Sequence, residues 1–152
     1  MLDGASASLI CRVGDLLCAV PLALVGETMR PLPVEPLAGV PNYVRGVAII
    51  RDRPTAVVDA ASLLTDHPGS PARFVTLTAG DRPIALAVDA VVGIARLPAA
   101  AGGSLGSVLE SPRLAAVTAA GTLDGALVLA LEGTRIVPDD VWAAMAAGGR
   151  PA

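Results

Sequence analysis

Residues 41–59 read PNYVRGVAIIRDRPTAVVD, and this stretch decides the fold. Residues 44–50 and 55–60 are apolar and rich in β-branched side chains, which predicts two buried strands. The segment Arg51-Asp52-Arg53-Pro54 lies between them and is typical of a turn. Charged side chains at the tip of a hairpin project into solvent, where an interaction residue is accessible. The stretch therefore predicts a hairpin whose strands belong to the core and whose tip is a surface for another protein.

The same combination of short apolar runs and Gly/Asp turns recurs on both sides of this hairpin. It predicts strands at residues 8–13 and 16–21 around Gly14-Asp15, at 73–78 and 84–88 around Gly80-Asp81, and at 114–120 and 127–131 around residues 122–125. Residues 88–94 continue the β character. Four prolines between residues 31 and 41 exclude a helix or a central strand there, so we expect an ordered connector on the surface.

Helix is predicted in two places. Residues 60–64 fit one helical turn, followed by a loop at 65–72. Pro138, Asp139 and Asp140 open a C-terminal helix through residue 145, because proline suits a first helical position and acids favour the positive end of the helix dipole. Residues 98–107 are rich in Ala and Gly and predict a mobile loop. The whole pattern predicts a single all-β domain over residues 1–152, a sandwich or barrel assembly with a short C-terminal helix. The buried stripe expected on that helix is Val141, Trp142 and Met145.

The composition narrows the class of protein. Hydrophobic residues make up 53% of the chain and charged residues 16%, so a core forms easily and disorder of the whole chain is excluded. The net charge is -3, and all eleven basic residues are arginines that form no basic block, so we expect no nucleic-acid binding. No secretion signal and no apolar stretch of about 20 residues is present, so we expect a cytoplasmic protein without direct membrane insertion.

No pattern of catalytic or metal-binding residues stands out. The chain lacks phosphate-loop, HExxH and CxxC motifs, so we expect no catalytic residue, cofactor or metal. His67 lies in a loop with no residue to orient it. We expect Asp59 and Asp89 to bond to backbone groups or an arginine at strand ends. For Cys11 and Cys18, two small buried thiols are favoured over a disulfide across the hairpin, and metal ligation is less favoured still.

Three segments together resemble a known family. They are Val25-Gly26-Glu27, which resembles a V-x-E motif; residues 43–60, which resemble Y-V-R-G-V-I-N-L-R-G-x-V-V-P-V-V-D-L; and residues 84–91, which are similar to a G-L-L-V-D-x-V segment. In motif, order and spacing the chain resembles the CheW family, the coupling proteins of bacterial chemotaxis. The resemblance extends from about residue 9 to residue 142.

The resemblance implies both a fold and a function. The fold is mainly β: two small five-stranded β-barrel subdomains packed side by side over a shared apolar interface. The function is that of a non-enzymatic adaptor. It joins the cytoplasmic tips of methyl-accepting chemoreceptors to a CheA-type histidine kinase through protein–protein contacts, in the cytoplasm at membrane-associated receptor arrays.

Residue by residue, the resemblance places Arg51 first among the partner-binding candidates, since arginine is enriched at interface hot spots. Three of the other candidates have an alternative role that stays open. Glu27 is alternatively solvated surface, Arg45 an ion-pair partner of Asp59 or a cap at a strand end, and Gly46 a relief of backbone crowding. The full set of candidates is Arg51, Glu27, Val25, Arg45, Gly46 and Asp52.

The departures from the family pattern suggest a second hypothesis. Ile49 replaces an asparagine, Asp52 a glycine and Ala56 a proline, and Asp52 adds a negative charge beside Arg51. The alternative function is therefore a diverged CheW-like scaffold for another kinase pathway, in motility or development. A third class, a small-molecule enzyme or sensor, requires a deep polar pocket that holds Asp59 or Asp89 with an arginine.

Overall fold

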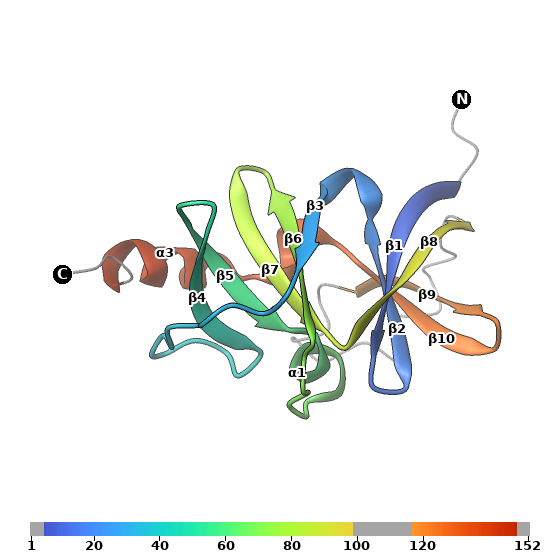
Figure 1. Ribbon diagram of the computed structural model, residues 1–152, viewed down its shortest axis with the longest axis horizontal. Helices are drawn as coiled ribbons and strands as arrows, with labels where there is room; N and C mark the ends of the chain where they lie inside the picture. Colours follow the sequence, from blue (N-terminus) through green and yellow to red (C-terminus); the bar gives the residue numbers. More distant parts are fainter. Residues whose placement is uncertain (1–4, 99–116, 149–152) are drawn as a thin grey trace.

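The protein is described by a computed structural model over residues 5–98 and 117–148. Strands dominate these ranges and form two five-stranded sheets, which lie side by side along the long axis of the molecule (Figure 1). Sheet A has the order β8-β1-β2-β10-β9 and sheet B the order β3-β6-β7-β5-β4. The predicted mainly β fold with two five-stranded units is confirmed. Within the described strands the two edges of each sheet do not pair with each other, so the sheets are curled and open rather than closed barrels.

The strands have the following bounds. Sheet A contains β1 (Ala5–Val13), β2 (Leu16–Pro21), β8 (Ala90–Pro98), β9 (Val117–Leu123) and β10 (Ala126–Leu131). Sheet B contains β3 (Val25–Met29), β4 (Val44–Ile50), β5 (Arg53–Asp59), β6 (Arg73–Ala79) and β7 (Arg82–Val88). The pairs β2–β10 and β5–β7 are parallel, and the other pairs within each sheet are antiparallel.

The turn of the β4–β5 hairpin is shorter than the sequence predicts. Ile50 pairs with Arg53, so only Arg51 and Asp52 form the turn, and both have positive φ (53° and 64°). A two-residue turn with positive φ at both positions matches the twist of the flanking strands. Pro54 therefore lies inside β5, where its missing N–H is tolerated because pairing of β5 with β7 begins only two residues later.

Short helices connect and end the sheets. The predicted helical turn is α1 (Ala60–Thr65), and the predicted C-terminal helix is α3 (Asp139–Gly148). In α3 the expected stripe is present: Val141 is buried, and Trp142 and Met145 pack half-buried against the core. The sequence did not predict η1 (Leu22–Leu24) or α2 (Gly133–Ile136).

Two predicted segments lie wholly or partly outside the described residues. The loop predicted at 98–107 falls almost entirely outside them, and so do the first three residues of the strand predicted at 114–120. The prediction ends this strand at residue 120, whereas β9 continues to Leu123. The turn consists of Asp124 and Gly125 alone, with φ of 51° and 82°.

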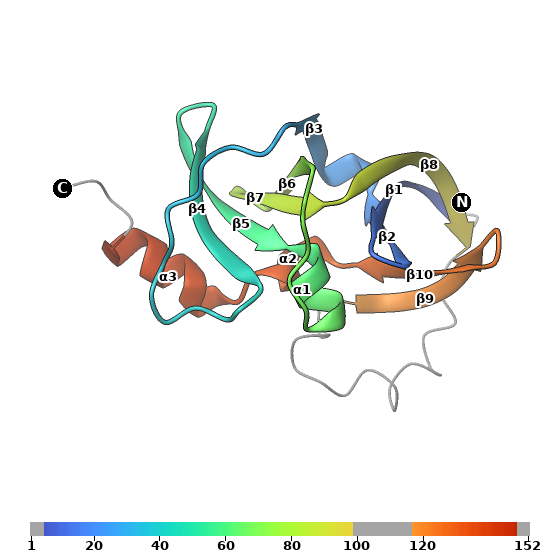
Figure 2. The same ribbon diagram turned by 60° about the horizontal axis from the view of Figure 1, so that its bottom comes forward.

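The core has three parts. The largest cluster lies between the two sheets, with side chains such as Cys11, Val20, Val58 and Leu86, and it includes α1 and the start of α3. Each sheet also encloses a smaller cluster of its own. Figure 2 shows α1 beneath sheet B and α3 at the far end of the molecule beside β4. The shared apolar interface expected between the subdomains is therefore present.

Candidate functional site

The exposed end of sheet B carries an ion pair between Glu27 and Arg51, which we call the edge clasp. The Arg51 guanidinium donates two parallel hydrogen bonds, from Nε to Glu27 Oε2 (2.9 Å) and from Nη2 to Glu27 Oε1 (2.8 Å). Glu27 lies on β3 and Arg51 in the β4–β5 turn, so the pair joins the two opposite edges of the open sheet. The side chain of Arg51 is 75% exposed and that of Glu27 35% exposed, so the clasp is accessible to a partner.

The clasp perturbs both of its charged groups. The hydrogen bonds from Arg51 hold the pKa of the Glu27 carboxyl below its ordinary value. The same hydrogen bonds raise the pKa of Arg51. Bidentate pairing of a guanidinium with a carboxylate also fixes the orientation of both groups. The clasp therefore presents a charged surface of defined geometry rather than two independent side chains.

A bulge in β3 accompanies the position of Glu27 in the clasp. The register with β6 shifts between Val25 and Thr28, and the Glu27 N–H donates to the Thr76 hydroxyl (2.8 Å). A Cβ at Gly26 would lie 2.7 Å from that hydroxyl oxygen, so a larger residue there would have to displace Thr76. The V-x-E motif thus has a physical basis, with Val25 half-buried against the main core and a glycine beside the bulge. Thr76 is a positioning residue that sequence reasoning missed.

The turn beside the clasp is strained. A positive φ costs an ordinary L-residue roughly 1–2 kcal/mol, and aspartate tolerates it better than most because its side chain bonds locally. Asp52 is exposed there and adds a carboxylate next to the clasp. On β4, Ile49 is 60% exposed and so places an apolar side chain near the same tip.

Arg45 lies at the opposite end of β4 and pairs with Asp59. Its Nη2 donates to Asp59 Oδ2 (2.6 Å) and to the Gly69 carbonyl (3.3 Å). The Asp59 side chain is 1% exposed and also accepts hydrogen bonds from the Ala61 and Gly69 N–H groups and the Ser62 hydroxyl. Asp59 is the N-cap of α1, and the bond from Ala61 satisfies one of the free N–H groups of that helix.

These contacts set the charge state of Asp59. Burial acts to raise the pKa of its carboxyl, but the hydrogen bonds from Arg45, Gly69 and Ser62 together outweigh burial, and the pKa lies below its ordinary value. The ion-pair alternative for Arg45 is therefore present in the structure. The Arg45 side chain remains 38% exposed, so it is also accessible to a partner.

Gly46 lets the connector cross β4. Its φ is 143°, and an added Cβ would lie 2.0 Å from the Glu35 carbonyl oxygen. Glu35 and Val47 exchange two backbone hydrogen bonds (2.8 and 2.9 Å), which attach the connector to the edge of β4. The backbone-crowding alternative for Gly46 thus has a direct structural explanation.

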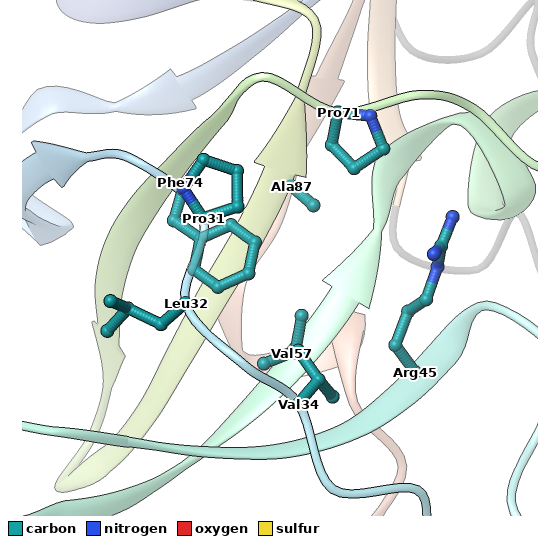
Figure 3. Close-up of a pocket in the computed structure, with 8 residues that line it drawn as sticks. All are labelled: Pro31, Leu32, Val34, Arg45, Val57, Pro71, Phe74 and Ala87. Atoms are coloured by element: carbon teal, nitrogen blue, oxygen red, sulfur yellow. The ribbon is translucent and has the colours of Figure 1, made fainter.

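A cavity of about 320 Å³ lies beneath the connector (Figure 3). Val57, Phe74 and Ala87 from neighbouring strands of sheet B line it. The connector contributes Pro31, Leu32 and Val34, and Arg45 lies at one side. Neither Asp59 nor Asp89 is among its lining residues. Asp89 instead accepts a hydrogen bond from the Gly14 N–H (2.8 Å), at the end of β7 as expected. This cavity is therefore not the polar pocket around Asp59 or Asp89 that an enzyme or sensor would require.

Comparison with known proteins establishes the family. The family model of the CheW-like domain matches residues 7–141. The chain belongs to the CheW family. The crystal structure of the scaffolding protein TtCheW from Thermoanaerobacter tengcongensis has the same fold, with a TM-score of 0.63 and 15% sequence identity over 84% of this chain and 88% of that chain. No curated protein matches the sequence.

In this CheW-family chain the six candidate residues fall into two groups. Val25, Glu27, Arg51 and Asp52 gather at the clasp end of sheet B. Arg45 and Gly46 lie at the other end of β4 and support the Asp59 network and the connector. The structure therefore brings four of the candidates together and separates the other two from them. Sequence spacing does not reveal this division, because all of them lie within residues 25–52.

Proposed function

We propose that this CheW-family chain is a non-enzymatic adaptor that couples the cytoplasmic tips of chemoreceptors to a CheA-type histidine kinase. The edge clasp is the observation that supports this most directly. It places an exposed, oriented arginine near an exposed apolar residue, Ile49, at the tip of the β4–β5 hairpin. Arginine with nearby apolar surface is typical of protein-binding hot spots. We place the adaptor in the cytoplasm at membrane-associated receptor arrays.

Two further features support an adaptor over an enzyme. In the described residues no group of three or more His, Cys, Asp or Glu side chains is arranged to hold a metal ion. The buried carboxylate of Asp59 already accepts hydrogen bonds from a helix N–H, a hydroxyl and an arginine.

Among the residues that the structure describes, no helix is both long and apolar enough to span a bilayer.

The experiment that tests the proposal is co-purification of the kinase and of a receptor fragment with the wild type and the Arg51→Ala variant. We expect Arg51→Ala to weaken binding of at least one partner by about tenfold or more, which is typical of a hot-spot arginine. Arg53→Ala is the matched control, because Arg53 lies on the same hairpin and its guanidinium donates to the Asp81 carbonyl (3.0 Å) rather than to the clasp. Equal binding by wild type and Arg51→Ala would contradict the site assignment.

The second candidate is a diverged scaffold of another kinase pathway, in motility or development. It is favoured by the exposed Ile49 and by Asp52, which change the surface around the clasp while the fold is kept. A swarm assay on a strain that lacks the gene distinguishes the two candidates. Impaired chemotaxis is expected for the first, and normal chemotaxis with loss of another kinase-dependent behaviour for the second.

A further inference from the structure

Cys11 and Cys18 face each other across the β1–β2 hairpin. They are direct partners in the antiparallel register and form the third residue pair from the turn. Both are free thiols, both are 0% exposed, and both belong to the core cluster between the sheets. Two cysteines thus share one face of one strand pair, with no side chain between them.

The register brings the two residues within the range of a disulfide. Directly opposed residues of an antiparallel pair have Cα atoms about 4.5–5.5 Å apart, and disulfides are found at Cα separations of about 4.4–6.8 Å. The two thiols are also close enough to interact. A side-chain hydrogen bond with Cys18 lowers the pKa of Cys11, and the same contact, together with burial, raises the pKa of Cys18. The two sulfurs therefore lie side by side in the folded protein, where a bond between them can be accommodated.

We propose that Cys11 and Cys18 form a redox-modifiable pair that closes to an intramolecular disulfide when the chain folds in the presence of a low-molecular-mass disulfide such as oxidised glutathione. The thiolate of one cysteine attacks one sulfur of the oxidant and releases the first glutathione thiolate. The other cysteine then loses its proton and attacks the mixed disulfide, which releases the second glutathione thiolate. The two cysteine sulfurs lose two electrons in total, and one glutathione disulfide is reduced to two glutathione thiols, which take up the two protons.

The position of the pair determines when this reaction occurs. β1 and β2 are central in sheet A, flanked by β8 and β10, and both thiols are closed off from solvent. An oxidant as large as glutathione disulfide therefore has no access to either sulfur in the folded protein. The redox state is set while the chain folds and afterwards changes only as fast as the sheet opens. This inference is independent of the adaptor function and of the edge clasp.

The test refolds the full chain from urea in a buffer of oxidised and reduced glutathione, and in parallel in dithiothreitol. Free thiols are then alkylated under denaturing conditions and counted by intact mass. We expect no alkylated cysteine, no glutathione adduct and a monomer after refolding with glutathione, and two alkylated cysteines after refolding with dithiothreitol. Native reduced protein kept in the same glutathione buffer is expected to retain both thiols.

The single-cysteine variant Cys18→Ala is the matched control and is expected to refold with one alkylatable thiol in either buffer, because a glutathione on Cys11 does not fit the packed core. The oxidised wild type is expected to unfold at a higher urea concentration than the reduced wild type. Wild type that keeps two free thiols, carries glutathione or forms a covalent dimer would overturn the proposal. So would an oxidised form that unfolds at a lower urea concentration than the reduced form, or native reduced protein that oxidises without unfolding.

Discussion

Replacing Arg45 by alanine is expected to destabilise the protein through Asp59. The substitution removes the 2.6 Å ion pair and leaves a carboxylate that is 1% exposed without its cation. The protein has a single tryptophan, Trp142, which packs half-buried on α3, so its fluorescence reports unfolding in urea. The comparison is between wild type, Arg45→Ala and the control Arg12→Ala, which removes an exposed strand arginine.

The size of the effect follows from the contacts of Asp59. Removing one partner of a fully buried ion pair costs about 3–5 kcal/mol. Here the Arg45 side chain is 38% exposed, and Asp59 keeps hydrogen bonds from Ala61, Ser62 and Gly69 (3.0–3.2 Å). A single hydrogen bond to a charged group contributes about 1.5–3 kcal/mol. We therefore expect a loss of about 2 kcal/mol, which lowers the urea midpoint by about 1 M for a typical denaturant dependence of about 2 kcal/mol per molar.

The loss is expected to depend on pH. In the folded wild type the pKa of Asp59 lies below its ordinary value, so the ionised carboxylate stabilises the fold above about pH 3.9. This stabilisation disappears as the pH falls through the pKa of the folded state. In Arg45→Ala the opposing effect of burial remains, so the pKa of Asp59 rises and its stabilising contribution is lost at higher pH. The difference between the two proteins is therefore largest near neutral pH and small once Asp59 is protonated in both.

Two results would refute this reasoning. One is an Arg45→Ala midpoint that matches that of Arg12→Ala, for which we expect a change within about 0.5 kcal/mol. The other is a difference between wild type and Arg45→Ala that stays constant down to a pH below the ordinary pKa of aspartate. Either result would show that Arg45 does not hold the charge of Asp59.

Three further predictions concern other parts of the chain. Asp52→Gly is expected to stabilise the protein by about 0.5 kcal/mol in urea unfolding, because glycine adopts the 64° φ without strain, and a loss of stability would contradict the turn geometry. Gly46→Ala is expected to cost about 3 kcal/mol or more, since its Cβ would overlap the Glu35 carbonyl; a variant as stable as wild type would show that the connector does not cross there. Burial, followed by the charge of Asp140, raises the pKa of Tyr43, the single tyrosine. An ultraviolet titration should therefore show that Tyr43 ionises above about pH 10, and at a lower pH in Asp140→Asn than in wild type. A midpoint at or below that of free tyrosine would refute the burial of Tyr43.

The hairpins were predictable because their signals are local. Gly14-Asp15, Gly80-Asp81 and Asp124-Gly125 lie between apolar runs, and each forms a turn of a β-hairpin. The turn at Arg51-Asp52 was placed correctly but predicted too long, because neither residue is glycine and a proline follows closely. The family pattern has glycine where Asp52 stands, and the positive φ gives the physical reason for that glycine.

The sequence supplied candidate residues for the site but not their arrangement in space. Glu27 and Arg51 lie on opposite edges of sheet B, and only the curl of the sheet brings them together. Thr76 is 49 residues from Glu27 in the chain, so no local pattern marks it as the residue that positions the bulge. For Arg45, sequence reasoning left two roles open, partner contact and an ion pair with Asp59. The burial of Asp59 depends on the packing of the whole core, so local sequence does not predict it.

A charge exchange across the clasp tests most directly whether Arg51 binds a partner or only joins two sheet edges. The double variant Glu27→Arg/Arg51→Glu keeps an ion pair at the same place with the charges reversed. We expect it to unfold at the same urea concentration as wild type and to lose binding of the kinase, the receptor or both in the co-purification assay. A double variant that binds both partners as wild type does would contradict a role of Arg51 in partner contact and would leave the clasp as a purely structural element.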